Sequence, residues 1–234
     1  MDQAQPNPRR LSLPLLAACC LLPTAQTFLS VYLEIWPFVL YPLMKVLILA
    51  TPILVWLAFR RPRNVLLNDL GVKRTNLLRG LASGVFVAGV ILVSYFTFMG
   101  PMVDPGPIAA KAKSLGILEH YWLMAVFISF WNSLVEEYYW RAFLFDQLRG
   151  YTGRTVWLVL LGGALFGMHH VFVFLGLVSL PLAALFTLGT AFAGGLWAWQ
   201  RARGHSIFDC YVSHILADLA GLWAGWDLIQ RAGG

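Results

Sequence analysis

Charged residues are scarce in this sequence. They make up 12% of its 234 residues, whereas an ordinary soluble domain has about 25%. So few charges cannot coat a globule of this size with polar surface, and 59% of the residues are hydrophobic. The composition therefore excludes a soluble enzyme, a disordered chain and a nucleic-acid-binding domain, so we expect no nucleic-acid partner.

Cysteine is scarce as well. Cys19 and Cys20 are adjacent, and Cys210 stands alone, each inside a long apolar segment. Three cysteines placed in this way exclude a disulfide framework and a cysteine-based zinc site.

Long apolar runs are what the sequence has in abundance. A helix needs about 20 mostly apolar residues to cross a bilayer. Seven such segments can be placed, at roughly 11–33, 37–59, 80–101, 119–148, 155–176, 178–200 and 206–229. We predict an all-α, polytopic membrane helical bundle of about seven to eight transmembrane helices, with the Pro-rich stretch 101–118 as its one sizeable loop on the non-cytoplasmic side.

The basic residues sort to one side of these spans. Twelve of the 17 lie in the N-terminus or in the segments after the second, fourth and sixth spans, namely Arg9, Arg10, Arg60, Arg61, Arg63, Lys73, Arg74, Arg79, Arg149, Arg154, Arg201 and Arg203. Cytoplasmic segments carry an excess of Lys and Arg. The N-terminus is therefore predicted to be cytoplasmic, and the net charge of +6 is mostly a signal of topology.

A few ionisable residues fall inside the spans. Inserting such a side chain at the centre of a membrane helix costs about 2.5–3.5 kcal/mol on insertion scales, so each of these residues is a candidate for a functional role. Glu137 and Arg141 are four residues apart, so they share a helix face and can form an ion pair. Glu136 points about 100° away and has Trp140, not a cation, at the corresponding position. A desolvated carboxyl group without a cation is a usual preparation of a general acid or base.

Histidines form two further clusters. His169 and His170 stand in tandem in the fifth span, where at most one of them is expected to face a given site. His214 and Asp218 lie four residues apart in the seventh span and share a helix face. Lys45 is expected to snorkel toward the interface, with no role in the site.

The clusters are predicted to lie at similar depths. Counted from the predicted cytoplasmic span ends, Glu136, His170 and His214 lie about 12–22 Å into the membrane at about 1.5 Å per residue. The sequence therefore predicts a polar cavity inside the membrane that contains Glu, His and Asp side chains.

Three motifs in these clusters resemble the motifs of a known family. Glu136-Glu137-x-x-x-Arg141, Phe166-x-x-x-His170 and His214-x-x-x-Asp218 are similar, in order and on separate helices, to those of the CPBP family. Its members are CAAX prenyl endopeptidase and bacteriocin-processing, abortive-infection-like membrane proteases. The resemblance covers about residues 120–225, and its Phe-to-His spacing selects His170 over His169.

The resemblance implies a glutamate-type intramembrane endopeptidase. Glu136 and His170 would activate a water, and His214 with Asp218 would stabilise the oxyanion. Glu137, Arg141 and Phe166 would have supporting roles. No cofactor is expected, and the partners would be the lipid bilayer and a membrane-associated peptide or protein substrate.

The resemblance also suggests a division of the chain and a location. Residues 1–118 would supply three N-terminal spans and a loop, and 119–229 the catalytic core of a single integral-membrane domain. The expected location is a bacterial inner membrane rather than the endoplasmic reticulum.

Two other classes of function fit the same residues. A zinc-dependent membrane protease would use Glu136, His170 and His214 as ligands, although no His-Glu-x-x-His helix is present. A proton-coupled transporter also places Glu and His at mid-membrane, but the two related halves usual in transporters are not visible in the sequence.

The last motif of the family commonly ends in Asn, whereas this sequence has Asp218. An ionised Asp would repel an oxyanion, so Asp218 is either protonated and a donor or orients His214 from behind. The substitution Asp218→Asn distinguishes the donor role from the orienting role in an assay of peptide cleavage. Retained activity is expected if Asp218 is a donor; a loss as large as that of His214→Ala would contradict that role.

Overall fold

A computed structural model describes residues 10–59 and 70–233 of the chain, and within them it has helices and no strand. Arg9, Arg60, Arg61 and Arg63, which contribute to the predicted topology, lie outside the described residues. The first half comprises α1 (Leu13–Thr27) with a π-helical turn (Phe28–Tyr32), α2 (Pro37–Ala58), a 3-10 turn (Val72–Arg74), α4 (Leu77–Ser94) with a π-helical turn (Tyr95–Met99), α5 (Gly100–Met102) and α6 (Pro105–Ser114).

The second half begins with one long, irregular helix and continues with three regular ones. Its elements are a 3-10 turn (Leu118–His120), α7 (Tyr121–Phe127), a π-helical turn (Ile128–Asn132), α8 (Ser133–Glu137), a second π-helical turn (Tyr138–Leu144), α9 (Phe145–Arg149), α10 (Thr155–Leu175), α11 (Leu180–Ala202) and α12 (Ile207–Gly233).

The predicted polytopic bundle is confirmed. Six described helices are long and apolar enough to cross a membrane, and a seventh span is formed if α6 and the helix 118–149 count as a pair, bent by 93°. The segment 101–118 is not a simple loop, because Asp104 accepts a hydrogen bond from the Gly106 N–H and Pro105 occupies the first turn of α6. This arrangement is typical of a capped helix start.

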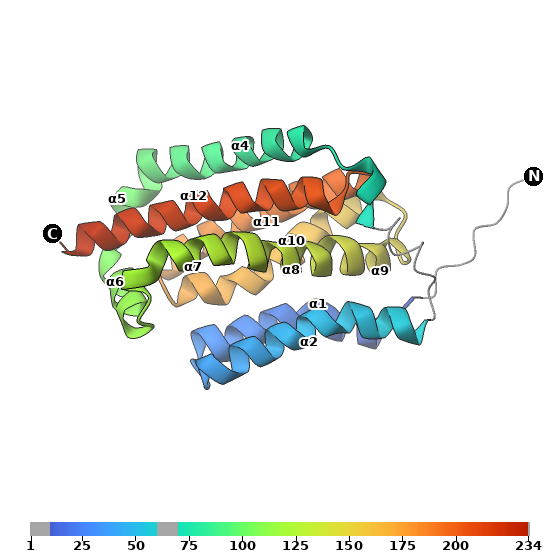
Figure 1. The fold of residues 1–234 in the computed structure, drawn as a ribbon, viewed down its shortest axis with the longest axis horizontal. Coiled ribbons are helices and arrows are strands. Elements are labelled where there is room, and N and C mark those ends of the chain that lie inside the picture. The colour runs from blue at the N-terminus through green and yellow to red at the C-terminus, as the bar shows by residue number, and fades with distance from the viewer. Residues whose placement is uncertain (1–9, 60–69, 234) are drawn as a thin grey trace, which may run out of the picture.

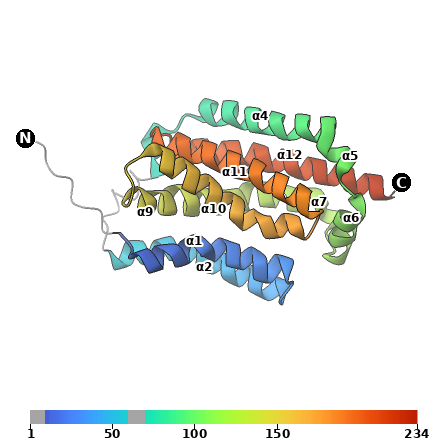
Figure 2. The same ribbon diagram turned by 180° about the vertical axis from the view of Figure 1, so that it is seen from behind.

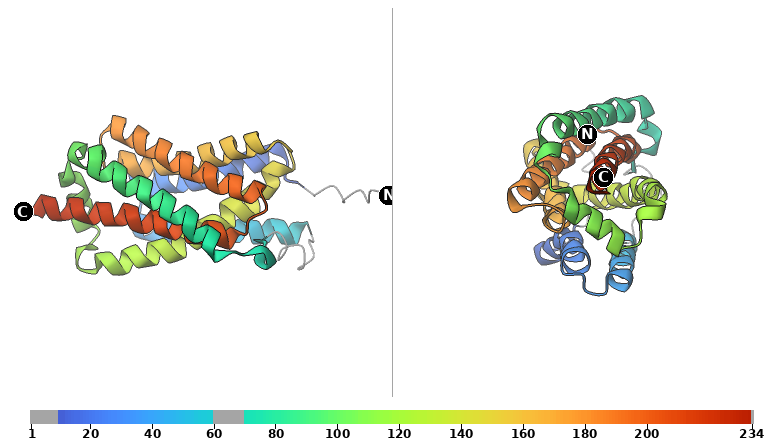
Figure 3. Two further views of the ribbon diagram at one scale, coloured as in Figure 1. Left: turned by 90° about the horizontal axis from the view of Figure 1, so that it is seen from above. Right: turned by 90° about the vertical axis from the view of Figure 1, so that its left-hand side faces the viewer.

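The helices form a bundle with α1 and α2 on one side and α4 on the other (Figure 1). The helix pairs α10 and α11, and α4 and α12, make the most extensive contacts. Figure 2 shows the same order from behind, and the end-on view in Figure 3 shows α1 and α2 side by side at the edge of the bundle. The long helix containing α8 therefore lies between the α1–α2 pair and α12.

Segments rich in basic residues meet at one end of the bundle. Arg10 donates to the Gly150 carbonyl, and a side-chain nitrogen of Arg74 lies 3.4 Å from the Cβ position of Gly204. These contacts join the N-terminal segment to the α9–α10 connection, and the 3-10 turn before α4 to the α11–α12 connection.

Glycines allow α4 and α12 to pack closely. A Cβ atom at Gly80 would lie 2.6 Å from the backbone oxygen of Asp209, and one at Gly84 would lie 2.9 Å from the Ser213 Cα. Small residues at such positions are the usual means by which membrane helices approach. This contact fixes α12, which carries His214, against the bundle.

Gly80→Ala is expected to destabilise the protein by about 1–3 kcal/mol, because the new methyl group meets a backbone atom that can only move with its helix. Gly89, on the same helix, has nothing within 4 Å of its Cβ position, so Gly89→Ala should stabilise by about 0.4–1 kcal/mol. Thermal unfolding in detergent measures both. Equal shifts for the two variants would contradict the close approach.

Candidate active site

Two adjacent glutamates lie on α8, between two π-helical turns. Glu136 and Glu137 are both buried, and the turns span Ile128–Asn132 and Tyr138–Leu144. Short π-helical segments widen a helix locally and occur frequently at functional sites. The irregular helix thus places both carboxylates in the interior of the bundle.

Glu137 forms the predicted ion pair with Arg141, at 3.3 Å between Oε1 and Nη1. The guanidinium carbon of Arg141 lies 4.4 Å from the centre of the Phe166 ring and 5.0 Å from that of Trp197. Its Nη2 also donates to the Gly194 carbonyl at 3.3 Å. Phe166 therefore supports the cation through its ring face.

The same carboxylate orients His214. Nδ1 of His214 lies 2.9 Å from Oε1 of Glu137, and the imidazole stacks on Trp197 with ring centres 4.4 Å apart. Because an ionised carboxylate only accepts, Nδ1 carries the hydrogen and Nε2 points the other way, 3.9 Å from Oε2 of Glu136. Sequence spacing pairs Glu137 with Arg141 alone and does not reveal this second partner.

Asp218 lies on the opposite side of His214 from Glu137. Its Oδ1 is 3.5 Å from Nε2 of His214, and its Oδ2 accepts a hydrogen bond from Ser133 Oγ at 2.7 Å. The position behind His214 therefore belongs to Glu137, and Asp218 is on the site side. Ser133 is a site residue that sequence reasoning missed, although its place four residues before Glu137 was a usable signal.

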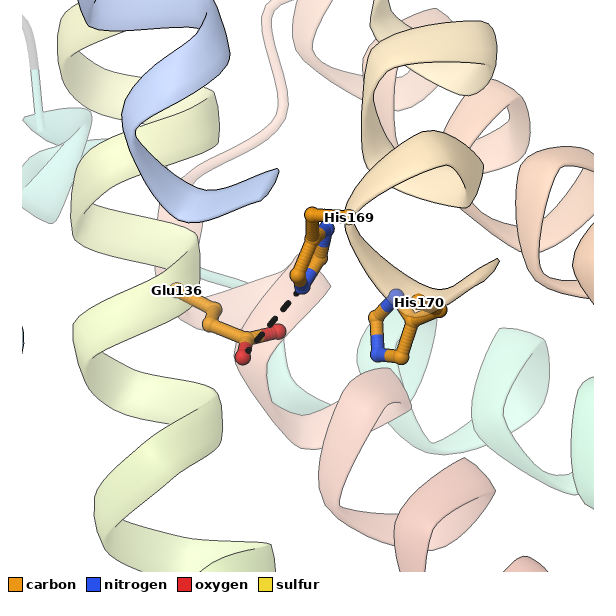
Figure 4. Close-up of side chains that lie close together, drawn as sticks. All are labelled: Glu136, His169 and His170. Atoms are coloured by element: carbon orange, nitrogen blue, oxygen red, sulfur yellow. Dashed lines mark ion pairs between the residues drawn. The ribbon is translucent and has the colours of Figure 1, made fainter. Parts of the chain in front are cut away.

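Both tandem histidines face Glu136, which corrects the expectation that at most one would (Figure 4). His169 Nε2 lies 3.6 Å from Oε1 of Glu136, and the metal-binding atoms of Glu136, His169 and His170 all lie within 4.8 Å of one another. The two rings converge, with centres 3.9 Å apart, because their side chains bend toward the same space. Spacing along a helix fixes the direction of Cβ but not that of the ring.

The backbone fixes which nitrogen of His170 is free. Nδ1 of His170 lies 3.0 Å from the carbonyl oxygen of Phe166. A carbonyl only accepts, so Nδ1 carries the hydrogen and Nε2 retains its lone pair. Phe166 thus positions both Arg141, through its ring, and His170, through its carbonyl.

Lys45 does not snorkel to the interface as predicted from the sequence. Its Nζ donates to Oδ1 of Asn132 and lies 3.5 Å from Oε1 of Glu136. The expectation that Glu136 has no cation nearby is wrong for the same reason. Sequence spacing describes neighbours on one helix, whereas this cation comes from α2.

The two carboxylate oxygens of Glu136 have different surroundings. Oε1 accepts from Nδ2 of Asn132 at 2.7 Å and faces Lys45 and His169. Oε2 is buried and has no hydrogen-bond partner among the described residues. An unpartnered carboxylate oxygen next to two imidazoles can accept a proton from a bound water.

Glu136, His169 and His170 could also hold a metal ion. This set contains His169 in place of the predicted ligand His214, whose Nε2 lies 3.9 Å from Oε2 of Glu136. Nitrogen and oxygen donors suit Zn²⁺, but the ammonium of Lys45 already lies 3.5 Å from the only carboxylate of the three.

Residues 118–220 match the sequence model of a family described as type II CAAX prenyl endopeptidase, Rce1-like. The match contains all three motifs and confirms the resemblance noted in the sequence. No curated protein and no solved structure matches the chain.

The Glu137–Arg141 pair gives a direct test of the site's structure. Glu137→Leu leaves a buried guanidinium without its anion and is expected to destabilise by about 3–5 kcal/mol. Adding Arg141→Met should recover part of that loss, because apolar side chains can replace a buried ion pair, whereas Nδ1 of His214 still lacks its acceptor. Thermal unfolding in detergent measures the recovery; a double variant no more stable than Glu137→Leu would contradict the pairing.

Proposed function

On the premise that residues 118–220 form a core like that of the type II CAAX prenyl endopeptidases, we propose that this integral membrane protein is an endopeptidase that hydrolyses a peptide bond of a membrane-associated substrate. Glu136 is the general base, and His170, His214 and Asp218 act with it. The observation that carries the proposal is that Oε2 of Glu136, a buried oxygen without a hydrogen-bond partner among the described residues, belongs to the carboxylate that lies beside the imidazoles of His169 and His170.

The first step is the activation of water. A water between Oε2 of Glu136 and Nε2 of His170 would give a proton to the carboxylate while its oxygen attacks the scissile carbonyl. Oε1 is engaged by Asn132 and faces Lys45 and His169, so proton transfer is directed to Oε2. The protonated Glu136 then returns the proton to the leaving amine, and the peptide bond breaks. General acid–base assistance of this kind contributes about 10²–10⁴-fold.

The oxyanion would be stabilised from α12. His214 presents Nε2 to the site, since Nδ1 donates to Glu137, and it donates to the oxyanion when both ring nitrogens carry hydrogen. Asp218 lies beside Nε2 and, as a protonated acid, would supply a second donor. Its location on the site side favours this donor role over that of a group behind His214.

The substrate would reach the site from the bilayer or its cytoplasmic face. The described connections between the helices contain no separate recognition domain. The name of the matching family includes a prenyl group and a CAAX tail. We therefore propose a lipid-modified or otherwise membrane-bound peptide as substrate, in a bacterial inner membrane and with the N-terminus in the cytoplasm.

Purified protein in phospholipid vesicles tests the proposal. The probe is a quenched fluorogenic peptide with a farnesylated cysteine four residues from its C-terminus, beside its unmodified twin. Glu136→Gln and His170→Ala should each lower cleavage at least about 100-fold, with melting temperatures showing that the variants fold. Glu119→Gln is the control, since Glu119 is exposed on the same helix. Normal cleavage by Glu136→Gln would refute the mechanism.

A zinc-dependent protease is the second candidate, and the cluster of Glu136, His169 and His170 is the observation that favours it. Treatment with 1,10-phenanthroline separates the two. We expect full cleavage in the chelator and no stoichiometric zinc by elemental analysis. Loss of cleavage, restored by Zn²⁺, would support the metalloprotease instead.

A further inference from the structure

Lys45 is a charged residue at the middle of a helix that is otherwise apolar and mostly exposed. It is nine residues into α2, Pro37–Ala58, in which Ile48 and Pro52 are the buried residues. It also lies outside the segment 118–220 that matches the protease family. A lysine here carries the insertion cost of a charge at depth, so its contacts deserve a functional explanation.

The ammonium group contacts Oε1 of Glu136 directly, at 3.5 Å, and also through the amide of Asn132. Nζ of Lys45 donates to Oδ1 of Asn132, and Nδ2 of the same amide donates to Oε1 of Glu136 at 2.7 Å. An ammonium only donates and a carboxylate only accepts, so the amide has one orientation that satisfies both neighbours. This chain of bonds requires Oε1 to be an acceptor, as it is in the ionised carboxylate.

Lys45 is also the one Lys or Arg side chain within ion-pair distance of Glu136 among the residues that the structure describes. Arg141 is paired with Glu137, and the other ionisable groups at the site are imidazoles and a carboxylate. These groups are His169 and His170 on α10 and His214 and Asp218 on α12. A fixed cation from α2 therefore completes the surroundings of Oε1.

We propose that Lys45, acting through Asn132, is a positioning residue for the hydrolysis: it holds Oε1 of Glu136 and so directs Oε2 toward the water and His170. The inference rests on the proposed function and extends it to a helix outside the matched segment. Asn132 shares the role, because its amide transmits the contact. Neither residue needs to touch the substrate.

The test uses the full-length protein in the same vesicles and the same farnesylated probe. Lys45→Met and Asn132→Leu should each lower kcat about 10- to 100-fold, the range for loss of a hydrogen bond to a charged group, with KM nearly unchanged. The double variant should lose little more than either single one, because both break one chain of contacts. Lys45→Arg should restore a substantial part of kcat.

A matched control and a stability cycle test whether Lys45 acts on Glu136. Lys113→Met removes an exposed lysine from α6 and should leave kcat unchanged. Lys45→Met should lower the melting temperature more in the wild-type protein than in the Glu136→Gln background, because Glu136→Gln already lacks the carboxylate charge that Lys45 faces. A lysine whose contribution to stability does not depend on Glu136 would lower both equally.

The outcomes distinguish this inference from the proposed function. Cleavage lost in Glu136→Gln but unchanged in Lys45→Met would overturn the role of Lys45 and leave the protease intact. An equal loss in Lys45→Met and Lys45→Arg, with a rise in KM instead of a fall in kcat, would also overturn it. A wild-type protein that cleaves nothing would overturn both the function and this inference.

Discussion

The structure depends on neutralising two adjacent carboxylates inside a membrane bundle. Neither Glu136 nor Glu137 can find enough partners on its own helix, and leaving either one unpaired costs several kcal/mol. Glu137 is satisfied by Arg141 and His214, and Glu136 by Asn132, Lys45 and His169. Because these partners come from α2, α10 and α12 as well as from the helix of the glutamates, charge compensation fixes how four helices pack.

The two glutamates nevertheless have different surroundings. Glu137 is fully buried and bonded to an arginine and a histidine, so it stabilises the site and orients an imidazole. Each glutamate keeps a buried Oε2 without a hydrogen-bond partner among the described residues, but Glu136 lies beside the imidazoles of His169 and His170, where a water or substrate could satisfy that oxygen. A rotation of about 100° between successive helix residues is sufficient to create this difference.

The features that depend on a single helix could be predicted from the sequence. Apolar length located the spans, four-residue spacing identified the Glu137–Arg141 pair, and the three motifs indicated a CAAX-protease-like core. The sequence did not predict Lys45, Asn132 or Ser133 as site residues, nor that both tandem histidines converge. In helices that are apolar on nearly every side, periodicity does not show which face meets which neighbour, so contacts between helices become visible only in the fold. The roles of the catalytic residues remain predictions.

The central claim is that Glu136 drives the hydrolysis of a peptide bond by water, and it can be tested without knowing the substrate. Membranes containing the wild-type protein or Glu136→Gln are incubated in H₂¹⁸O, and the released peptides and new C-termini are compared by mass spectrometry. If Glu136 drives the hydrolysis, a set of new C-terminal carboxylates carrying one ¹⁸O forms with the wild-type protein and is absent with Glu136→Gln. The same labelled set from both membranes would contradict it.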